Sequence, residues 1–346
     1  MGPLHILLAI FGISLLVIVH EGGHYLVARA FGMRVTTFSI GFGTALWKYR
    51  PKGSPTTFKI CAVPFLAYVQ IDGMNPSDHV DPEDAALYPN KSVFARIATI
   101  FAGPFANYLA ASLIVFGLAL SGLPRRIPIE PMTVDRVMDD SPAAAAGVRE
   151  GDIILEANGE AIANVEELIE ATRGRAGQPT VYRIRRGEEE LERTITPREQ
   201  DGRGVIGVSA RSRQVYEPVS FGTAVERALV FPLEITVIQL QGIAQLIRQR
   251  STEGITGPVG MGKMMAQSVE EGARVYIFRL MLLSVALGMF NLLPFPALDG
   301  GRLMFLGYEL VTRRRANERV EAWVHTVGLL FLLGVLVLVT FRDIVS

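Results

Sequence analysis

The sequence has little cysteine, no excess of either charge and few charged residues overall. Its 346 residues include one cysteine, Cys61, which excludes an intrachain disulfide framework and a cysteine-based zinc site. The 34 basic residues are balanced by 34 acidic ones, so the basic excess typical of a nucleic-acid-binding protein is missing. Charged residues make up 20% of the chain and hydrophobic residues 49%. A charged fraction below the usual ~25% predicts a membrane protein that carries one charged, soluble part.

Four apolar stretches are long enough to cross a membrane as helices, which takes about 20 residues each. They lie at residues 4–29, 97–120, 280–298 and 323–341. The first could instead be a signal peptide, but it lacks the basic start and the small-residue cleavage site of that class. Basic residues gather between the first and second stretches and between the third and fourth. The positive-inside rule therefore puts those two loops in the cytoplasm and both termini outside.

A fifth apolar stretch, residues 228–247, could be mistaken for a further crossing. It contains Pro232, Glu234 and several glutamines, which favour an amphipathic helix lying on the membrane surface. We therefore expect four transmembrane helices and a surface helix.

The first apolar helix contains an H-E-x-x-H pattern, His20-Glu21-Gly22-Gly23-His24. Residues four apart lie on one face of a helix, so both imidazoles can reach one metal ion. Glu21 follows the first histidine and is placed to take a proton from water activated by the metal. So short a pattern also arises by chance. However, a charged side chain in mid-membrane costs at least ~2.5–3.5 kcal/mol, and this cost favours a functional role.

A catalytic zinc site needs a third protein ligand, which here must come from a distant part of the chain. Residues 22–71 contain neither aspartate nor glutamate, and the metzincin pattern does not continue after the second histidine. The remaining candidates are Asp72, His79, Asp299 and His325. We favour Asp299, at the end of an apolar helix interrupted by Pro294 and Pro296. Irregular backbone at membrane depth is tolerated where it is packed in protein or lines a cavity, and a carboxylate there is a candidate site.

These motifs together resemble the site-2 protease family of intramembrane zinc metalloproteases, in particular the bacterial regulator of sigma-E protease type. The resemblance covers nearly the whole chain. It rests on the histidine motif, on the sequence Asn-Leu-Leu-Pro-Phe-Pro-Ala-Leu-Asp-Gly-Gly at 291–301, and on Ala-Gly-Pro at 102–104 followed by Asn107. One departure is the sequence Leu-Ala-Tyr-Val-Gln at 66–70, where well-studied relatives have Gly-Gly-Tyr-Val-Lys.

The resemblance implies a complete set of site residues. His20, His24 and Asp299 would bind Zn²⁺, Glu21 would act as the base, and Asn291 would contact the substrate. The implied reaction is cleavage, within the membrane, of single-span membrane proteins such as anti-sigma factors already trimmed on the outside.

Residues 128–200 are richer in charge and in strand-like alternation than the rest of the chain. The stretch 141–159, with a run of small residues, a strand and an Asn-Gly turn, resembles a bacterial PDZ domain. Asn164 predicts the start of a helix over 165–173. PDZ domains bind extended peptides by strand addition, so we expect this part to bind peptide termini. Another small α+β module is the alternative.

The expected fold is a multi-pass α-helical membrane protein with four transmembrane helices, a short membrane-associated β element and one extracytoplasmic α+β PDZ-like domain. Its expected parts are 1–121 with the zinc motif, 128–200, the amphipathic surface helices of 219–275, and 276–346 with the last two membrane helices.

The expected location is the bacterial inner membrane, with the active site toward the cytoplasmic side and the termini and PDZ-like domain outside. Expected partners are single-span membrane proteins, the lipid bilayer and peptide termini, with no nucleic acid. The alternative from another class is a non-enzymatic membrane adaptor that holds a structural or transported metal.

Overall fold

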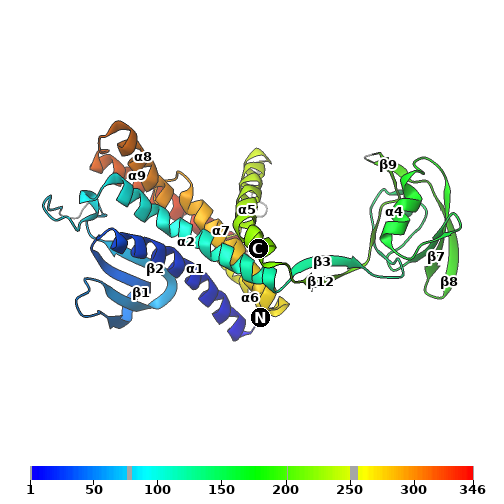
Figure 1. Ribbon diagram of the computed structural model, residues 1–346, viewed down its shortest axis with the longest axis horizontal. Helices are drawn as coiled ribbons and strands as arrows, with labels where there is room; N and C mark the ends of the chain where they lie inside the picture. Colours follow the sequence, from blue (N-terminus) through cyan, green and yellow to red (C-terminus); the bar gives the residue numbers. More distant parts are fainter. Residues whose placement is uncertain (1, 76–79, 201, 250–255, 346) are drawn as a thin grey trace. The chain divides into compact units, whose positions relative to one another are not determined.

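The computed structural model describes residues 2–75, 80–200, 202–249 and 256–345. The candidate ligand His79 lies outside these residues. Contacts divide the chain into a helical unit, residues 1–120 with 220–346, and a second unit, residues 121–219 (Figure 1).

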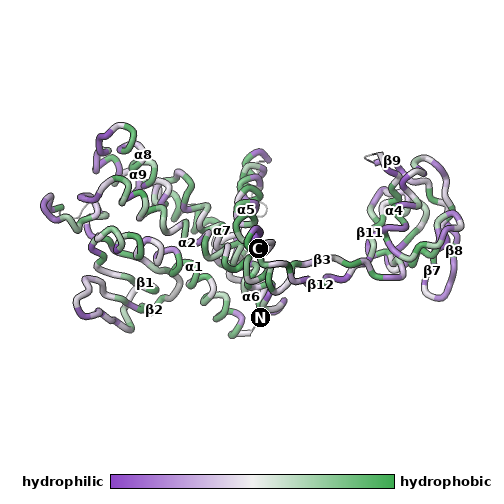
Figure 2. The backbone as a smooth tube through the Cα atoms, in the orientation of Figure 1, coloured by the Kyte–Doolittle hydropathy of each residue, from purple (hydrophilic) through white to green (hydrophobic). Residues whose placement is uncertain are grey.

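The helical unit contains most of the apolar sequence. Its helices are α1 (Pro3–Ala30), α2 (Val93–Leu120), α5 (Phe221–Gln249), α6 (Pro258–Glu271), α7 (Ala273–Leu292), α8 (Asp299–Thr312) and α9 (Glu318–Val345), with a 3₁₀ turn at Tyr88–Asn90. In the described part of the chain, five helices are long and apolar enough to cross a membrane: α1, α2, α5, α7 and α9. Figure 2 shows the hydrophobic colour concentrated along these helices. Composition and length therefore give one candidate span more than the four expected.

Helices α1 and α7 run in the same direction, and α2 runs against them (Figure 1). The Tyr276 hydroxyl, near the start of α7, donates a 2.6 Å hydrogen bond to the carbonyl oxygen of Leu8, near the start of α1. Arg274 at the start of α7 donates to the carbonyl of Leu118 at the end of α2, over 2.9 Å. The end of α1 and the end of α7 consequently lie at the same end of this three-helix group.

Helix α5 crosses α2 obliquely. Its first ring, Phe221, packs on Phe116 with ring centroids 5.5 Å apart, and Thr236 shares a 2.8 Å hydrogen bond with Tyr108. Between these contacts the chain advances about 22 Å along α5 but about 12 Å along α2, at 1.5 Å per residue. Figure 1 shows α5 running across the direction of α2. Thus α5 does not follow the common direction of α1, α2 and α7.

A curled two-strand sheet, β1 (Val35–Tyr49) and β2 (Thr57–Ile71), packs against α1. Phe38 of β1 pairs with Phe58 on one side and with Val69 on the other, because β2 folds back along both sides of β1. Strand β2 extends to Ile71, which pairs with Val35 at the start of β1. Residues 67–71 therefore form an outer edge of this sheet beside α1.

The unit 121–219 has its own core and its own sheet. Its elements are β3 (Leu123–Pro128), β4 (Val134–Val137), α3 (Pro142–Ala145), β5 (Ile153–Ala157), β6 (Glu160–Ala161), α4 (Val165–Arg173), β7 (Thr180–Arg186), β8 (Glu189–Ile195), β9 (Arg198–Gln200), β10 (Arg203–Val205), β11 (Val208–Ala210) and β12 (Ser212–Glu217). The central sheet has the order β6-β5-β7-β8, around buried side chains such as Ile154, Tyr182 and Ile184. The unit is wider than 128–200, since β3 pairs with β12 and β4 pairs with β11.

The Asn164 cap is present, as predicted. The Asn164 side chain accepts a 3.0 Å hydrogen bond from the backbone N–H of Glu167, and the Glu167 carboxylate accepts one of 2.7 Å from the N–H of Ala163. The first of these bonds satisfies a donor that the first helical turn leaves free, and the second ties the residue before the cap to the helix.

The third expected helix, 280–298, lies six to seven residues earlier in the structure. Helix α7 begins at Ala273 and ends at Leu292, and α8 begins at Asp299. Pro294 and Pro296 lack the N–H that a helix interior needs, so residues 293–298 form a connecting loop. Asp299 consequently lies in the first turn of α8 instead of ending α7.

Candidate metal centre

His20 and His24 extend from one face of α1 into the helical unit. Their side chains are nearly buried, with 6% and 7% of their surface exposed. The two rings meet edge to face, and their Nε2 atoms are 3.3 Å apart. The four-residue spacing thus brings both Nε2 atoms to one point.

Helix α2 forms the floor under these rings. Gly23 of α1 packs so tightly on Ala102 that a Cβ at residue 23 would overlap the carbonyl oxygen of residue 102. A Cβ on Gly103 would likewise overlap Nε2 of His24 and lie 2.9 Å from Nε2 of His20. The carbonyl oxygen of Thr99, one turn earlier, lies 2.8 Å from Nδ1 of His24. Glycine at these two positions therefore leaves room for the pair of imidazoles.

Asp299 reaches the histidines from the start of α8. The following glycines allow α8 to begin directly against the loop: a Cβ on Gly300 would overlap the carbonyl oxygen of Leu293, and one on Gly301 would lie 2.5 Å from that of Phe295. A carboxylate in the first turn of a helix is also stabilised by the helix dipole. The Asp-Gly-Gly sequence thus fixes where this carboxylate points.

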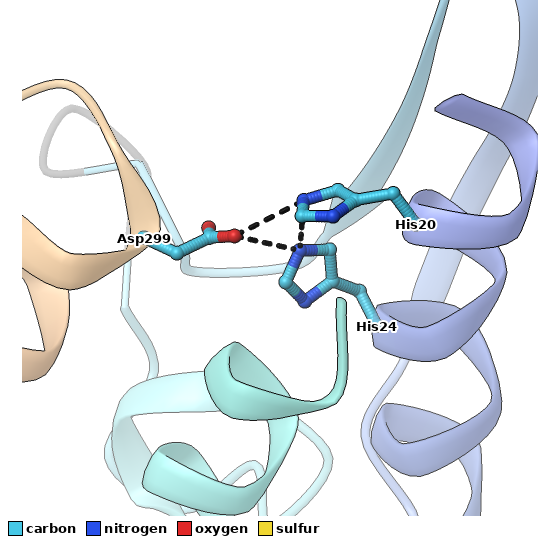
Figure 3. Close-up of side chains that lie close together, drawn as sticks. All are labelled: His20, His24 and Asp299. Carbon is cyan, nitrogen blue, oxygen red and sulfur yellow. Dashed lines mark hydrogen bonds and ion pairs between the residues drawn. The ribbon is translucent and has the colours of Figure 1, made fainter. Parts of the chain in front are cut away.

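The three side chains converge on one point (Figure 3). Oδ2 of Asp299 lies 3.1 Å from Nε2 of His20 and 3.3 Å from Nε2 of His24, and in the described structure this buried oxygen makes no conventional hydrogen bond. Ligand atoms of three side chains bound tetrahedrally to zinc at about 2.0–2.2 Å lie roughly 3.3–3.6 Å from each other. The donor types and spacing therefore fit a zinc ion, with room for a further ligand on the cavity side.

Glu21 lies beside this group and contacts the outer strand of the sheet. Its Oε2 accepts a 3.0 Å hydrogen bond from the backbone N–H of Val69. A cavity of about 460 Å³ opens here, and its walls include both histidines, Glu21, Asp299 and the strand residues 68–71. A carboxylate, three atoms with the spacing of metal ligands and the outer edge of a strand therefore share one cavity.

Of the other predicted residues that the structure describes, one lines this cavity and two do not. Asn291 lines the same cavity, and its side-chain nitrogen donates to the carbonyl of Leu287. Asp72 lies 3.6 Å from Arg34 in an ion pair, and Nδ1 of His325 accepts a hydrogen bond from the N–H of Ala297. Among the described residues, the group whose donor atoms lie close enough together to hold a metal ion comprises His20, His24 and Asp299, without Asp72 or His325.

Some residues that shape the centre cannot be found by searching the sequence for catalytic or metal-binding side chains. Thr99 and Val69 act through backbone groups, and Gly103 acts through the absence of a side chain. The one sequence signal was the Ala-Gly-Pro motif in α2, which gave the resemblance but not the contact.

The fold and the site define a helical protein in which a histidine motif and an aspartate bring together three side chains with the donor atoms and spacing for a metal ion. The chain belongs to peptidase family M50, the family of the site-2 proteases, whose model matches residues 8–335. Together with the apolar helices, this family places it among integral membrane proteins.

Relatives match over nearly their whole length. One from Mesorhizobium japonicum is 32% identical over 361 residues, covering 97% of both chains, and one from Clostridium perfringens is 31% identical over 346 residues, covering 99% of both. Both are named as candidate zinc metalloproteases.

Among solved structures, the PDZ domain of an SdrC-like protein from Listeria monocytogenes matches with 24% identity. It covers 25% of this chain and 93% of that one, with a TM-score of 0.22. The HtrA3 PDZ domain matches with 20% identity and a TM-score of 0.17, covering 28% of this chain and 92% of that one.

Proposed function

We propose that this protein is a zinc-dependent intramembrane endopeptidase that cleaves the membrane segments of single-span membrane proteins. The observation that carries the proposal is the convergence of His20 Nε2, His24 Nε2 and Asp299 Oδ2 within 3.1–3.3 Å, beside Glu21 in one cavity. Membership of a peptidase family and the names of the relatives support the same reaction.

His20, His24 and Asp299 would hold the zinc ion, and Glu21 would move the protons. Bound zinc would supply Lewis acidity, which makes water a stronger acid and the scissile carbonyl a better electrophile. Glu21 accepts the proton of the attacking water and later gives a proton to the leaving amine. The Val69 N–H donates a hydrogen bond to one oxygen of Glu21, and Glu21 lines the cavity.

The substrate would bind as an added strand. A transmembrane substrate is helical, and attack on a carbonyl needs a locally extended, exposed peptide bond. Residues 67–71 form an outer edge of the sheet and 68–71 line the cavity, so an unwound substrate segment can pair with this edge. Asn291, on the cavity wall, is the proposed side-chain contact to that segment.

We propose four crossings, by α1, α2, α7 and α9, in the bacterial inner membrane, with both termini outside the cytoplasm. Because α1 and α7 are parallel, the end of α2 and the start of α7 lie on one side. If α5 also crossed, the link from Gln249 to Pro258 would have to return across the membrane. Nine peptide units reach at most about 32 Å, barely the ~30 Å hydrocarbon core. A reporter fused after Gly272 that proved cytoplasmic would reject this topology.

The unit 121–219 is, in this proposal, an extracytoplasmic PDZ-like domain that binds peptide termini. Its support is the sequence resemblance, together with a sheet and a capped helix of the expected kind. The substrates are membrane proteins with a short outer part, as for anti-sigma factors already trimmed there.

The test compares wild type with Glu21→Gln, using purified protein of verified zinc content and a model transmembrane peptide. Glu21→Gln should keep its zinc and lose cleavage by roughly 10²–10⁴-fold. Glu83→Gln, at an exposed position away from the cavity, is the matched control and should cleave normally. Cleavage retained in zinc-loaded Glu21→Gln would reject Glu21 as the base. Wild type that binds zinc but cleaves no membrane peptide would favour the non-enzymatic adaptor.

A further inference from the structure

Asn107 is a fully buried polar residue of α2 that touches the metal centre. Its side-chain Nδ2 lies 3.2 Å from Nδ1 of His20, and its surface exposure is 0%. Its other terminal atom, Oδ1, is buried and has no hydrogen-bond partner in the described part of the chain. Such an unpaired buried acceptor costs about 1–3 kcal/mol, so its presence beside a metal-binding histidine requires a reason.

The second histidine, His24, shows which ring nitrogen must carry the hydrogen if the other is to bind a metal ion. Nδ1 of His24 lies 2.8 Å from the carbonyl oxygen of Thr99, and a carbonyl oxygen only accepts hydrogen bonds. His24 therefore carries its hydrogen on Nδ1, and the lone pair of Nε2 points at the common centre. Metal-binding histidines commonly donate their second N–H to a carbonyl or carboxylate in this way.

His20 can carry its hydrogen on Nδ1, as His24 does, only if the side-chain oxygen of Asn107 faces Nδ1 of His20. With Nδ2 facing the ring, Nδ1 of His20 must accept, and the ring hydrogen moves to Nε2, which then cannot bind a cation. The oxygen and nitrogen of an amide have almost the same shape, so hydrogen-bond partners decide which atom is which. Turning the amide by 180° places Oδ1 against Nδ1 of His20. This turn gives the buried oxygen a donor and frees the Nε2 lone pair.

We infer that Asn107 is a positioning residue that holds His20 in the Nδ1–H form, with its amide oxygen facing the ring. Three acceptors, Nε2 of His20, Nε2 of His24 and Oδ2 of Asp299, then face each other at 3.1–3.3 Å with no hydrogen between them. They repel each other unless a cation lies between them. Asn107 thereby keeps hydrogens out of the space between these three atoms, which leaves a site for a cation.

This inference rests on the proposed metal role of His20, and its test uses zinc affinity of the full chain in detergent, by competition with a chelator. Asn107→Leu removes the acceptor at similar size and should weaken zinc binding by about 10–100-fold. Asn107→Asp restores an acceptor oxygen and should bind zinc within a few-fold of wild type. Asn107→Leu with wild-type affinity, or Asn107→Asp as weak as Asn107→Leu, would overturn the inference.

Ser284→Ala is the matched control for packing at the same place. The Ser284 hydroxyl donates to the backbone carbonyl of Asn107 over 2.9 Å, and its side chain is equally buried. This variant should keep zinc affinity, since it leaves the amide of Asn107 unchanged. A loss equal to that of Asn107→Leu would assign the effect to packing and overturn the inference.

A second readout separates this inference from the proposed function. Histidine ¹⁵N NMR of metal-free protein reports which ring nitrogen carries the hydrogen, and a His20→Gln variant assigns the His20 signals. Wild type should show His20 protonated on Nδ1, and Asn107→Leu should lose that preference. A wild-type His20 protonated on Nε2 overturns the inference even if the enzyme cleaves. A protonated Nδ1 upholds it even if cleavage is absent.

Discussion

The carboxylate of Glu21 and the backbone N–H of Val69 are joined by a 3.0 Å hydrogen bond across 48 residues of sequence. This contact links the H-E-x-x-H helix to the outer edge of the β1–β2 sheet. The residue proposed to move protons and the strand proposed to bind substrate are therefore in direct contact.

Val69→Pro should slow cleavage without removing zinc. Proline lacks the N–H, and because this N–H points at Glu21 and not at β1, the pairing of the sheet is kept. A hydrogen bond to a charged group contributes about 1.5–3 kcal/mol, so the rate should fall by about 10–100-fold. Val69→Ala keeps the N–H and should cleave near the wild-type rate. Cleavage assays on protein of verified zinc content measure both, and equal rates for the two variants would contradict the role of this N–H.

Gly103→Ala should impair zinc binding even though alanine favours helices over glycine by about 1 kcal/mol. The added Cβ would overlap Nε2 of His24 and lie 2.9 Å from Nε2 of His20, so the rings must move apart. We expect zinc affinity to drop by at least tenfold in a chelator competition. Gly117→Ala, in the same helix with nothing within 4 Å of its Cβ, is the control and should bind zinc normally. If both variants bind zinc equally well, Gly103 does not form the floor of the centre.

The apolar helices could be predicted from the sequence because a span needs about 20 consecutive apolar residues, and the histidine motif because residues four apart share one face of a helix. The end of the third helix could not, since a proline-broken segment can end a helix or precede another, and Asp299 turned out to begin α8. Nor could the β2 edge at 67–71, because it depends on a strand that folds back along β1. Thr99 and Val69 contribute backbone atoms, which every residue has, so their roles follow only from packing.

The buried ion pair between Arg96 and Glu309 should stabilise the position of α8. The guanidinium of Arg96, in α2, makes two hydrogen bonds of 2.5 and 3.0 Å to the carboxylate of Glu309, in α8, and α8 begins with Asp299. Breaking a buried pair on one side costs about 3–5 kcal/mol, whereas replacing both members with apolar residues is often tolerated.

Glu309→Leu should lower the thermal midpoint more than Arg96→Met does. Loss of Glu309 leaves Arg96 buried without its carboxylate, whereas loss of Arg96 leaves Glu309 with Arg315 at 3.5 Å. The double variant should recover most of the midpoint. Thermal unfolding in detergent measures all three, and equal effects of the single variants with no recovery in the double variant would show that this pair does not hold α8.

In the unit 121–219, the carboxylate of Asp152 should stabilise the fold at neutral pH and lose this effect in acid. Burial alone would raise the pKa of this carboxyl, but hydrogen bonds from Arg186 and from the backbone N–H of Arg149 outweigh it and hold the pKa below its usual value. A carboxyl with a lowered pKa in the folded state contributes its full stability above the unfolded pKa of about 3.9. That contribution is lost as the pH falls through the folded pKa.

Asp152→Asn should therefore destabilise this unit by about 1–3 kcal/mol at pH 7 and by the same amount at pH 5. The difference from wild type should shrink below about pH 4, since wild type then loses the same charge. Urea unfolding of the full chain, followed by proteolytic cleavage within residues 121–219, measures the unit. Asp135→Asn is the control, because its 3.8 Å pair with Arg211 is half-exposed and should contribute less than about 1 kcal/mol. A difference between wild type and Asp152→Asn that stays constant from pH 7 to pH 3 would show that the carboxylate charge is not what stabilises the unit.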